Sequence, residues 1–377
     1  MTSKERVLAA INHREVDRLP MDLGSTNCTT MTKVAYTNLK KLLGVDKPNV
    51  LIQEDFQVSV IDEEVLETLA VDTRGVFGLT YRFPREFVDY RTYYDHFRKK
   101  FHMAENAYYF SMVENPLANM ETVEEMKDSF KWPDPYDPKT IEGLKEKAKK
   151  LHDENKYAIV GDIVDTGIFE PAWYLRGMDN FLVDIMVNED IAHYILENML
   201  KFQKGRYEYF LEEVGEYLDI VFVGDDLATA QSTIMSKDTY REMIKPYQKD
   251  YFSFIKSKTP AKLMYHSCGN ILPFIDDLIE IGVDILNPVQ VSVADMDTRL
   301  LKEKYGDSIC FWGAIDTHSV LPNGSKAEVE AEVRKRIDEL GPTGYVICPV
   351  HDVQPDVPAE NILTMYKYAM EYMTSSK

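Results

Sequence analysis

The chain has 377 residues, of which 45% are hydrophobic and 28% charged, and its formal net charge at pH 7 is −20. This is the composition of a globular protein with enough apolar material for one large core or two smaller ones. The acidic excess disfavours nucleic acids and anionic membranes as partners, because both require a basic surface that neutralises phosphates. The four cysteines are too few for a secreted disulfide framework. The amino terminus also lacks the apolar core of a signal peptide, so we expect a cytoplasmic protein.

The predicted elements begin with a helix at residues 3–12, a strand at 18–23 and a second helix at 33–43. Residues 80–135 then interrupt the pattern with an aromatic, charge-mixed stretch. This segment predicts a β-hairpin excursion or lid over one end of the fold, and packing on the outside of the fold is the alternative.

The C-terminal two thirds of the chain alternate short apolar or β-branched runs with longer segments of helical periodicity, which is typical of βα units. The predicted strands are 157–163, 219–223, 262–266, 283–287, 309–313 and 344–348, and the predicted helices are 179–213, 236–258, 271–281, 297–305, 326–340 and 358–373. Such units favour a closed parallel barrel or a doubly wound sheet. No G-x-G-x-x-G turn follows the first strand, which argues against a dinucleotide fold. We therefore predict an α/β fold: a single (β/α)8 TIM-barrel domain over residues 1–377 with an N-terminal extension and the excursion.

Polar and metal-binding residue types follow five successive predicted strands. They are Asp225 and Asp226, then His266 and Cys268, then Gln290, then Asp316, and finally His351 with Asp352. The carboxyl ends of barrel strands form the active-site rim, so we expect these side chains to lie close together.

The H-x-C sequence at His266 and Cys268 is the sharpest of these patterns. In an extended segment, side chains two residues apart point to the same side, so the imidazole and the thiolate can reach one ion. Sulfur and imidazole together suit Zn²⁺, and a catalytic zinc site uses three protein ligands and keeps one position open. Cys348 and His351, at the end of the last strand, are both candidates for a further ligand. A buried cysteine beside a hydrogen-bonded histidine, without metal, is the alternative reading.

Other candidate residues have a structural and a functional interpretation. Asp225 and Asp226 could cap a helix or act in chemistry. Glu170, Trp173 and Tyr174 could line the pocket, although aromatic side chains here often pack in a core or rim. We interpret Cys310 as a core thiol and Cys28 as a neutral loop residue. The histidines without a ligand-spaced partner are interpreted as surface or structural residues: His13, His96, His102, His152, His193 and His318.

The chain resembles the uroporphyrinogen decarboxylase superfamily at several motifs spread over nearly its whole length. These motifs lie at residues 5–7, 17–20, 69–72, 173–177, 224–227, 266–269 and 355–362. The resemblance implies a barrel with one of two chemistries, metal-free porphyrinogen decarboxylation or zinc-dependent methyl transfer coupled to corrinoid proteins.

The residues favour the second chemistry. Decarboxylases of the superfamily carry an arginine-rich segment near the amino terminus that holds the substrate carboxylates, whereas residues 18–27 here run from Arg18 to Asn27 without those arginines. An octacarboxylate would therefore keep unpaired charges, which is unfavourable. By contrast, residues 266–269 match the H-x-C-G of methylcobamide:thiol methyltransferases, in which a late cysteine is the third zinc ligand. His351 aligns with that cysteine, and decarboxylases also have a histidine near this point, so His351 could be a ligand or an inherited pocket residue.

We therefore expect a zinc-containing methyltransferase that moves a methyl group between a small molecule, such as a methoxylated compound, and a separately encoded corrinoid protein. The expected zinc ligands are His266, Cys268 and His351, with Cys348, Glu170 or Asp225 as less favoured donors. Asp225, Asp226 and Glu170 are the expected proton donors or acceptors, and the expected substrate contacts are Asn27, Trp173, Tyr174, Gln290 and Asp316. The alternatives are a decarboxylase-like lyase and a non-catalytic binding protein on the same barrel.

Overall fold

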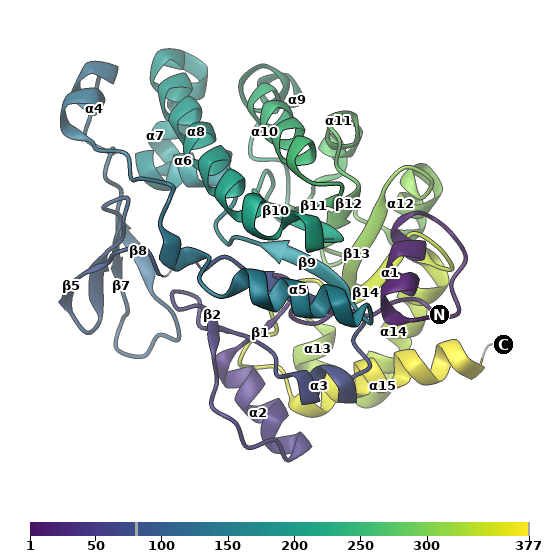
Figure 1. Ribbon diagram of the computed structural model, residues 1–377. Helices are drawn as coiled ribbons and strands as arrows, with labels where there is room; N and C mark the ends of the chain where they lie inside the picture. Colours follow the sequence, from purple (N-terminus) through teal and green to yellow (C-terminus); the bar gives the residue numbers. More distant parts are fainter. Residues whose placement is uncertain (80–81, 376–377) are drawn as a thin grey trace.

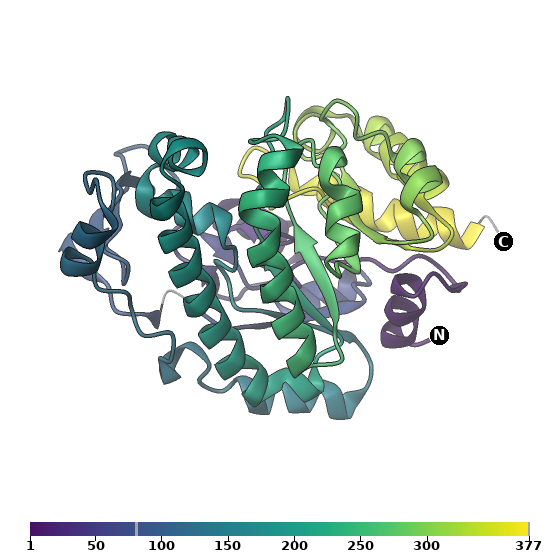
Figure 2. The same ribbon diagram turned by 90° about the horizontal axis from the view of Figure 1, so that it is seen from above.

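Seven parallel strands form one curled sheet at the centre of the computed structural model, which describes residues 1–79 and 82–375. Their order along the sheet is the order of the chain, with β4 at one edge and β14 at the other. The strands are β4 (Thr73–Phe77), β9 (Ala158–Asp162), β10 (Ile220–Gly224), β11 (Lys262–His266), β12 (Ile285–Asn287), β13 (Cys310–Ile315) and β14 (Tyr345–Pro349). Helices follow these strands and cover the outside of the sheet (Figures 1 and 2).

The predicted strand at residues 18–23 lies between the two edges of this sheet and closes it. Met21 forms a parallel bridge with Ile347 of β14, and the Asp22 amide donates to the Ile347 carbonyl at 2.9 Å. On the other side, the Asp72 amide donates to the Met21 carbonyl at 2.8 Å. The predicted (β/α)8 TIM barrel is therefore confirmed, with this short segment in the position of the eighth strand.

The amino-terminal helix closes the end of the barrel at which the strands begin. Val7 and Ile11 of α1 (Ser3–Ile11) join the buried cluster inside the barrel, where inward-facing residues of successive strands such as Phe222, Met264 and Trp312 pack together. Because this end is filled, the opposite end, where the strands terminate, is the one that remains available for a site.

Each predicted helix has a counterpart in the structure, but three of them are divided. The segment predicted as one helix at 179–213 is two helices, α7 (Met178–Val187) and α8 (Glu189–Val214), with Asn188 between them. The segment predicted at 236–258 contains α9 (Lys237–Thr239), the π-helical turn η4 (Tyr240–Ile244) and α10 (Lys245–Lys258). The segment predicted at 271–281 contains the 3-10 turn η5 (Leu272–Phe274) followed by α11 (Ile275–Glu280). The other helices are α2 (Lys33–Leu43), α3 (Glu63–Thr68), α4 (Val123–Ser129), α5 (Leu144–Glu154), α6 (Phe169–Arg176), α12 (Thr298–Tyr305), α13 (Val320–Asn323), α14 (Lys326–Leu340) and α15 (Ala359–Ser375). Of these, α3, α4, α5, α6 and α13 were not predicted.

The excursion predicted at 80–135 contains a separate antiparallel sheet in place of a single hairpin; its first two residues, 80 and 81, lie outside the described residues. The sheet has the order β5-β6-β7-β8, with β5 (Glu86–Asp89), β6 (Thr92–Tyr94), β7 (Lys100–His102) and β8 (Ser111–Glu114). Figure 1 shows it set apart from the barrel strands. Hydrogen bonds from Tyr109 to Gln354 (2.5 Å) and from Asn115 to the Tyr174 carbonyl (2.8 Å) attach the excursion to segments that follow β14 and β9, at the carboxyl end of the barrel.

A second small antiparallel sheet follows the first barrel segment, residues 18–23, along the chain. It has the order β1-β3-β2, with β1 (Met31–Thr32), β2 (Leu51–Gln53) and β3 (Val58–Ser59). None of the helices in the described part of the chain combines the length and the apolar character that crossing a membrane would require.

Candidate active site

His266 is the best-positioned donor at the carboxyl end of the barrel. It ends β11, is buried, and its Nδ1 lies 2.5 Å from Asn287 Oδ1. The Asn287 amide nitrogen donates to the Trp312 carbonyl at 3.0 Å, which fixes the amide orientation. An amide oxygen only accepts hydrogen bonds, so Nδ1 carries the proton and the lone pair of Nε2 is available. A histidine oriented in this way by its second nitrogen is typical of a metal ligand.

Burial also keeps His266 neutral, because it lowers the pKa of the imidazole to about 4. The lone pair of Nε2 faces the Cys268 thiol, and the Sγ to Nε2 distance is 3.4 Å. From zinc–sulfur and zinc–nitrogen bonds of about 2.3 and 2.0–2.1 Å, two ligands of one tetrahedral ion would lie roughly 3.5 Å apart. The pair therefore has the chemistry and the spacing that a zinc ion requires.

Two sets of donors share His266. In the first set, ligand atoms of Asp226, His266 and Cys268 lie within 4.8 Å of one another, and in the second set those of Cys28, His266 and His351 do so. The three predicted ligands are thus brought together around His266, but Cys268 and His351 belong to different sets. The rings of His266 and His351 have centroids 5.3 Å apart.

His351 is less prepared for metal binding than His266. Its Nδ1 accepts a hydrogen bond from the Asp352 amide at 2.8 Å, so in the neutral ring Nε2 carries the proton. Burial and the neighbouring His266 lower the pKa of His351 to about 4. Binding through His351 therefore requires that this hydrogen bond is given up or that the ring rotates.

The predictions for the three remaining cysteines have different outcomes. Cys28, interpreted from the sequence as a neutral loop residue, lies beside His266 and His351, which the sequence could not indicate because these residues are far apart along the chain. Cys348, the alternative ligand, is buried inside the barrel with its thiol 3.8 Å from Asp22 Oδ2 and belongs to neither donor set. Cys310 is a core thiol, as predicted.

The acidic residues divide into structural and accessible groups. The Asp225 carboxylate is buried and accepts backbone hydrogen bonds from Ile168, Phe169 and Glu170 at 2.6–3.0 Å, so it fixes the start of α6. Asp226 accepts the Cys268 amide at 2.7 Å and is one of the metal-capable donors. Asp225 therefore caps a helix, although it is not the helix that follows it.

Glu170 is the acidic residue best suited to donate a proton. Burial, reinforced by the charges of Asp226 and Asp225, raises the pKa of its carboxyl group to about 8. Its Oε1 accepts the Tyr174 hydroxyl at 2.9 Å. A carboxyl group with this pKa is protonated at neutral pH and can act as an acid.

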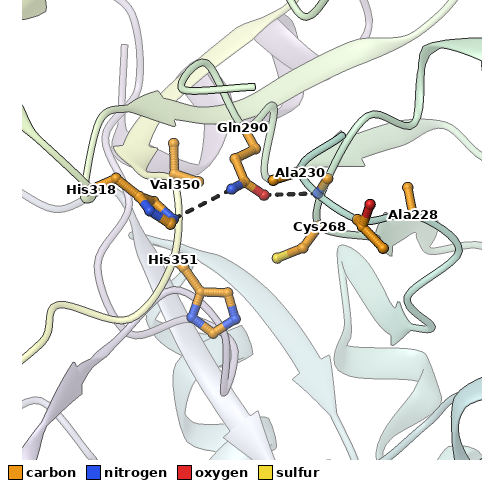
Figure 3. A pocket seen from close by; sticks show the side chains of 9 residues that line it. Ala228, Ala230, Cys268, Gln290, His318, Val350 and His351 are labelled. Carbon is orange, nitrogen blue, oxygen red and sulfur yellow. Dashed lines mark hydrogen bonds between the residues drawn. The ribbon is translucent and has the colours of Figure 1, made fainter. Parts of the chain in front are cut away.

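A pocket of about 290 Å³ opens at this end of the barrel (Figure 3). It is lined by Ala228, Thr229, Ala230, Cys268, Gly269, Gln290, His318, Val350 and His351. The Gln290 Oε1 accepts a hydrogen bond from the Gly269 backbone amide at 2.8 Å, and its Nε2 lies 3.3 Å from His318 Nε2. His318, interpreted from the sequence as surface or structural, is therefore a pocket residue.

The other predicted substrate contacts lie outside the lining of this pocket. The Asp316 carboxylate accepts the amides of His318 and Ser319 and fixes the turn that carries His318. Trp173 and Tyr174 pack against each other with ring centroids 4.0 Å apart. The backbone amide of Asn27 donates to the Asp162 carboxylate at 2.7 Å, at the end of β9.

The model of the family Uroporphyrinogen decarboxylase (URO-D) matches residues 87–372, which is most of the chain. The chain belongs to the uroporphyrinogen decarboxylase family. Curated relatives include uroporphyrinogen decarboxylases from Chlorobium phaeobacteroides, 26% identical over 171 residues, and from Pelodictyon phaeoclathratiforme, 25% identical over 170 residues. These alignments cover 44% and 43% of this chain and 45% of each relative, so the matched part is less than half of each relative's length.

A solved structure of a methyltransferase from Methanosarcina mazei has the same fold over the whole chain. Its TM-score is 0.68 at 16% identity, and the match covers 99% of both chains. This likeness supports the barrel and its closure.

The residues around the pocket do not provide the charges that a substrate with many carboxylates would require. Glu170 and Asp226 lie near the Cys268 thiol, and the buried Arg206 donates to the backbone carbonyls of Ile163, Val164 and Asp165. Its guanidinium is thus committed to holding the loop after β9. The residues that line the pocket include no Lys or Arg, so the lining offers no such cation to pair with the carboxylates of a substrate.

Proposed function

We propose that this family member is a zinc-dependent methyltransferase that moves a methyl group between a small molecule and a corrinoid carried by a separate protein. The observation that carries the proposal is the pair His266 and Cys268, with donor atoms 3.4 Å apart and an imidazole whose free nitrogen is set by Asn287. Sulfur and nitrogen donors at the rim of a barrel suit a catalytic zinc site. Bound zinc would supply Lewis-acid chemistry at the heteroatom that gives up or receives the methyl group.

The protein residues have distinct roles in this proposal. Asn287 keeps His266 in the ligating tautomer. Glu170, protonated at neutral pH, supplies the proton that a departing oxygen needs, and Asp225 positions it by fixing the first turn of α6. Gln290 and His318 line the pocket and orient the substrate.

The preferred methyl donor is a small methoxylated compound, so that the reaction is an O-demethylation. Ala228, Ala230 and Val350 give the pocket apolar walls, and its size of about 290 Å³ suits a small molecule. The aromatic excursion is attached to the same end of the barrel. The corrinoid is assigned to a partner because this chain has no D-x-H-x-x-G cobalamin-binding loop of its own.

Decarboxylation of a porphyrinogen is the second candidate, and the names of the matched relatives favour it. The pocket lining argues against it, since it contains no Lys or Arg to pair with the substrate carboxylates. A non-catalytic binding protein on the same barrel is the third candidate, and any methyl transfer would exclude it.

A panel of methyl donors tests the proposal. Methoxyarenes, methanol, methylated amines and methylated thiols are each incubated with the zinc-loaded protein and cob(I)alamin, and methylcobalamin formation is followed optically. We expect methylation from a methoxylated donor and its loss in Cys268→Ala. Transfer only to thiol acceptors would reverse the assigned direction. Decarboxylation of uroporphyrinogen without any methyl transfer would reject the proposal.

A further inference from the structure

The metal-capable donors around His266 form two sets. In the first set the other donors are Asp226 and Cys268, and in the second set they are Cys28 and His351. We infer that the first set holds the zinc ion of the proposed site, with Asp226 as the third protein ligand, and that His351 stays outside the ligand shell and contacts the substrate. The inference rests on the proposed function, and it gives Asp226 and His351 roles that differ from those expected from the sequence.

Asp226 is fixed to the turn that carries Cys268. The ends of β10 and β11 pair with each other, with Gly224 opposite His266. Beyond these ends, three hydrogen bonds join residues 225–227 to residues 266–268: the Asp225 amide donates to the His266 carbonyl at 2.9 Å, the Cys268 amide to the Asp226 carboxylate at 2.7 Å, and the Leu227 amide to Ser267 Oγ at 3.0 Å. Ligands that are held in place beforehand lose little conformational freedom when the metal binds. The neighbouring strands therefore preorganise the first set.

The Asp226 carboxylate keeps an oxygen available for a metal ion. The Cys268 amide donates to Oδ1, and within residues 1–79 and 82–375 no second hydrogen-bond donor and no Lys or Arg pairs with this carboxylate. The adjacent Asp225 differs, because both of its oxygens accept hydrogen bonds, from the amides of residues 168–170 and from Gln248. Of these two neighbouring acids, only Asp226 can give an oxygen to a metal without losing a hydrogen bond.

The first set also balances the charge of the ion. On binding, the Cys268 thiol loses its proton to solvent as its sulfur forms a bond to the metal, while Asp226 and the neutral His266 each donate a lone pair. A Zn²⁺ ion with one thiolate, one carboxylate and one imidazole has no net charge, which makes its burial less unfavourable. Three protein ligands leave the fourth position open, as in a catalytic zinc site.

His351 is prepared for a substrate and not for a metal. Its Nδ1 accepts the Asp352 amide at 2.8 Å, so the neutral ring carries its proton on Nε2. His351 and Cys268 both line the pocket, whereas Asp226 and His266 do not (Figure 3). A molecule in the pocket thus meets the thiolate side of the metal centre and the imidazole of His351, whose N–H can donate to the heteroatom of the methyl donor.

The zinc affinities of matched variants test this choice of ligands by chelator competition. Asp226→Asn should weaken zinc binding by about 100-fold or more, because losing a ligand should exceed the effect of losing a partner of a ligand. His351→Gln should bind zinc nearly as well as the wild type. Asp225→Asn is the control, since it removes the same charge one residue away from a carboxylate that is committed to amides, and it should lose much less affinity.

Two results would overturn the inference. Weakened binding in both Cys28→Ala and His351→Gln, with wild-type affinity in Asp226→Asn, would assign the metal to the second set. Equal losses in Asp225→Asn and Asp226→Asn would show that the affinity responds to charge alone. Circular dichroism of each variant identifies any loss of affinity that results from unfolding.

A second measurement needs no variant, so it stays decisive if Asp226→Asn fails to fold. X-ray absorption at the zinc edge of the wild-type protein counts the sulfur ligands and, through multiple scattering, the imidazole ligands. We expect one sulfur and one imidazole, with oxygen in the remaining positions. Two imidazoles would overturn the inference and leave the proposed function intact. Wild-type protein that binds no zinc would reject both, whereas a one-imidazole site without methyl transfer would reject the proposed function alone.

Discussion

Asn287 determines which nitrogen of His266 faces the other donors. Its oxygen accepts the proton of Nδ1 at 2.5 Å, and its own nitrogen is held by the Trp312 carbonyl. Replacing Asn287 by Ala should lower the zinc affinity by about 10–100-fold, because second-shell partners of ligating histidines contribute effects of that size. A chelator competition titration measures the change.

The control for this variant is Asn361→Ala. Asn361 is also buried, and its side-chain nitrogen donates hydrogen bonds to the backbone carbonyls of Leu321 and Gly324, but it does not contact His266. It should lose stability without losing zinc affinity. Equal affinity in the wild type and in Asn287→Ala would show that the tautomer of His266 is set in another way.

Glu170 gives the reaction a predicted pH dependence. Burial and the neighbouring acids raise the pKa of Glu170 to about 8, so the proton-donating form is present below that pH and is lost as the pH rises through it. The rate of demethylation should therefore fall on the alkaline side of about pH 8. Glu170→Gln should reduce kcat by about 100-fold or more and remove this limb of the profile.

Tyr174→Phe is the informative companion variant. The Tyr174 hydroxyl donates to the Glu170 carboxylate and so favours its charged form. Removing that hydroxyl should raise the pKa of Glu170 and move the alkaline limb to higher pH. A limb that stays in place in both variants would assign the titration to another group.

At the scale of elements, Asp225 links β10 to the start of α6. Its carboxylate accepts three backbone amides of residues 168–170 and the amide of Gln248. Asp225→Ala should lower the free energy of unfolding by about 2–3 kcal/mol, because several buried donors lose a charged acceptor. Urea denaturation measures this loss. Asp225→Asn keeps one acceptor oxygen and should lose less, and equal losses in the two variants would contradict the capping role.

The elements that sequence reasoning located well are those whose pattern is local. The predicted range 262–266 coincides with β11, and 326–340 coincides with α14, because uninterrupted apolar runs and helical spacing mark them. β4 was not predicted, since Arg74 and Gly75 interrupt its apolar residues. Its buried Arg74 is accommodated by an ion pair with Glu63 of α3 and by the ring of Tyr157, which lies far away in the sequence.

The same distinction explains which site residues could be predicted. His266 and Cys268 are only two residues apart, so their proximity is visible in the sequence, although Cys268 lies beyond the end of β11. Cys28 and His318 enter the site only because the barrel closes and loops from different strands meet there. The sequence around Asp225 is compatible with helix capping and with a role in chemistry, and only its contacts with α6 assign it a structural role.

At the scale of the whole molecule, one carboxylate joins the parts that close the barrel. Asp72 is fully buried and pairs with Arg6 of α1 and Arg18 of the first barrel segment, each at 2.7 Å. It also accepts the Met21 amide at 2.9 Å, next to the bridge that completes the sheet. Three of the motifs that carry the family resemblance, at residues 5–7, 17–20 and 69–72, thus meet in one ion-pair network. Their contribution is to the closure of the fold, at the end of the barrel away from the pocket.

Asp72→Ala should therefore destabilise the entire barrel, including regions far from the substitution. It leaves two largely buried arginines without their common partner, and breaking a buried pair in this way reduces the free energy of unfolding by roughly 3–5 kcal/mol. Because the segment that Asp72 holds bridges β14 and β4, we expect the variant to unfold in one transition at lower urea, monitored by both circular dichroism and tryptophan fluorescence. Asp17→Ala is the control, since Asp17 also pairs with Arg6 but its side chain is 37% exposed, and its loss should be about 1 kcal/mol or less. Two separate transitions in Asp72→Ala, or an effect no larger than that of Asp17→Ala, would show that the barrel stays closed without this network.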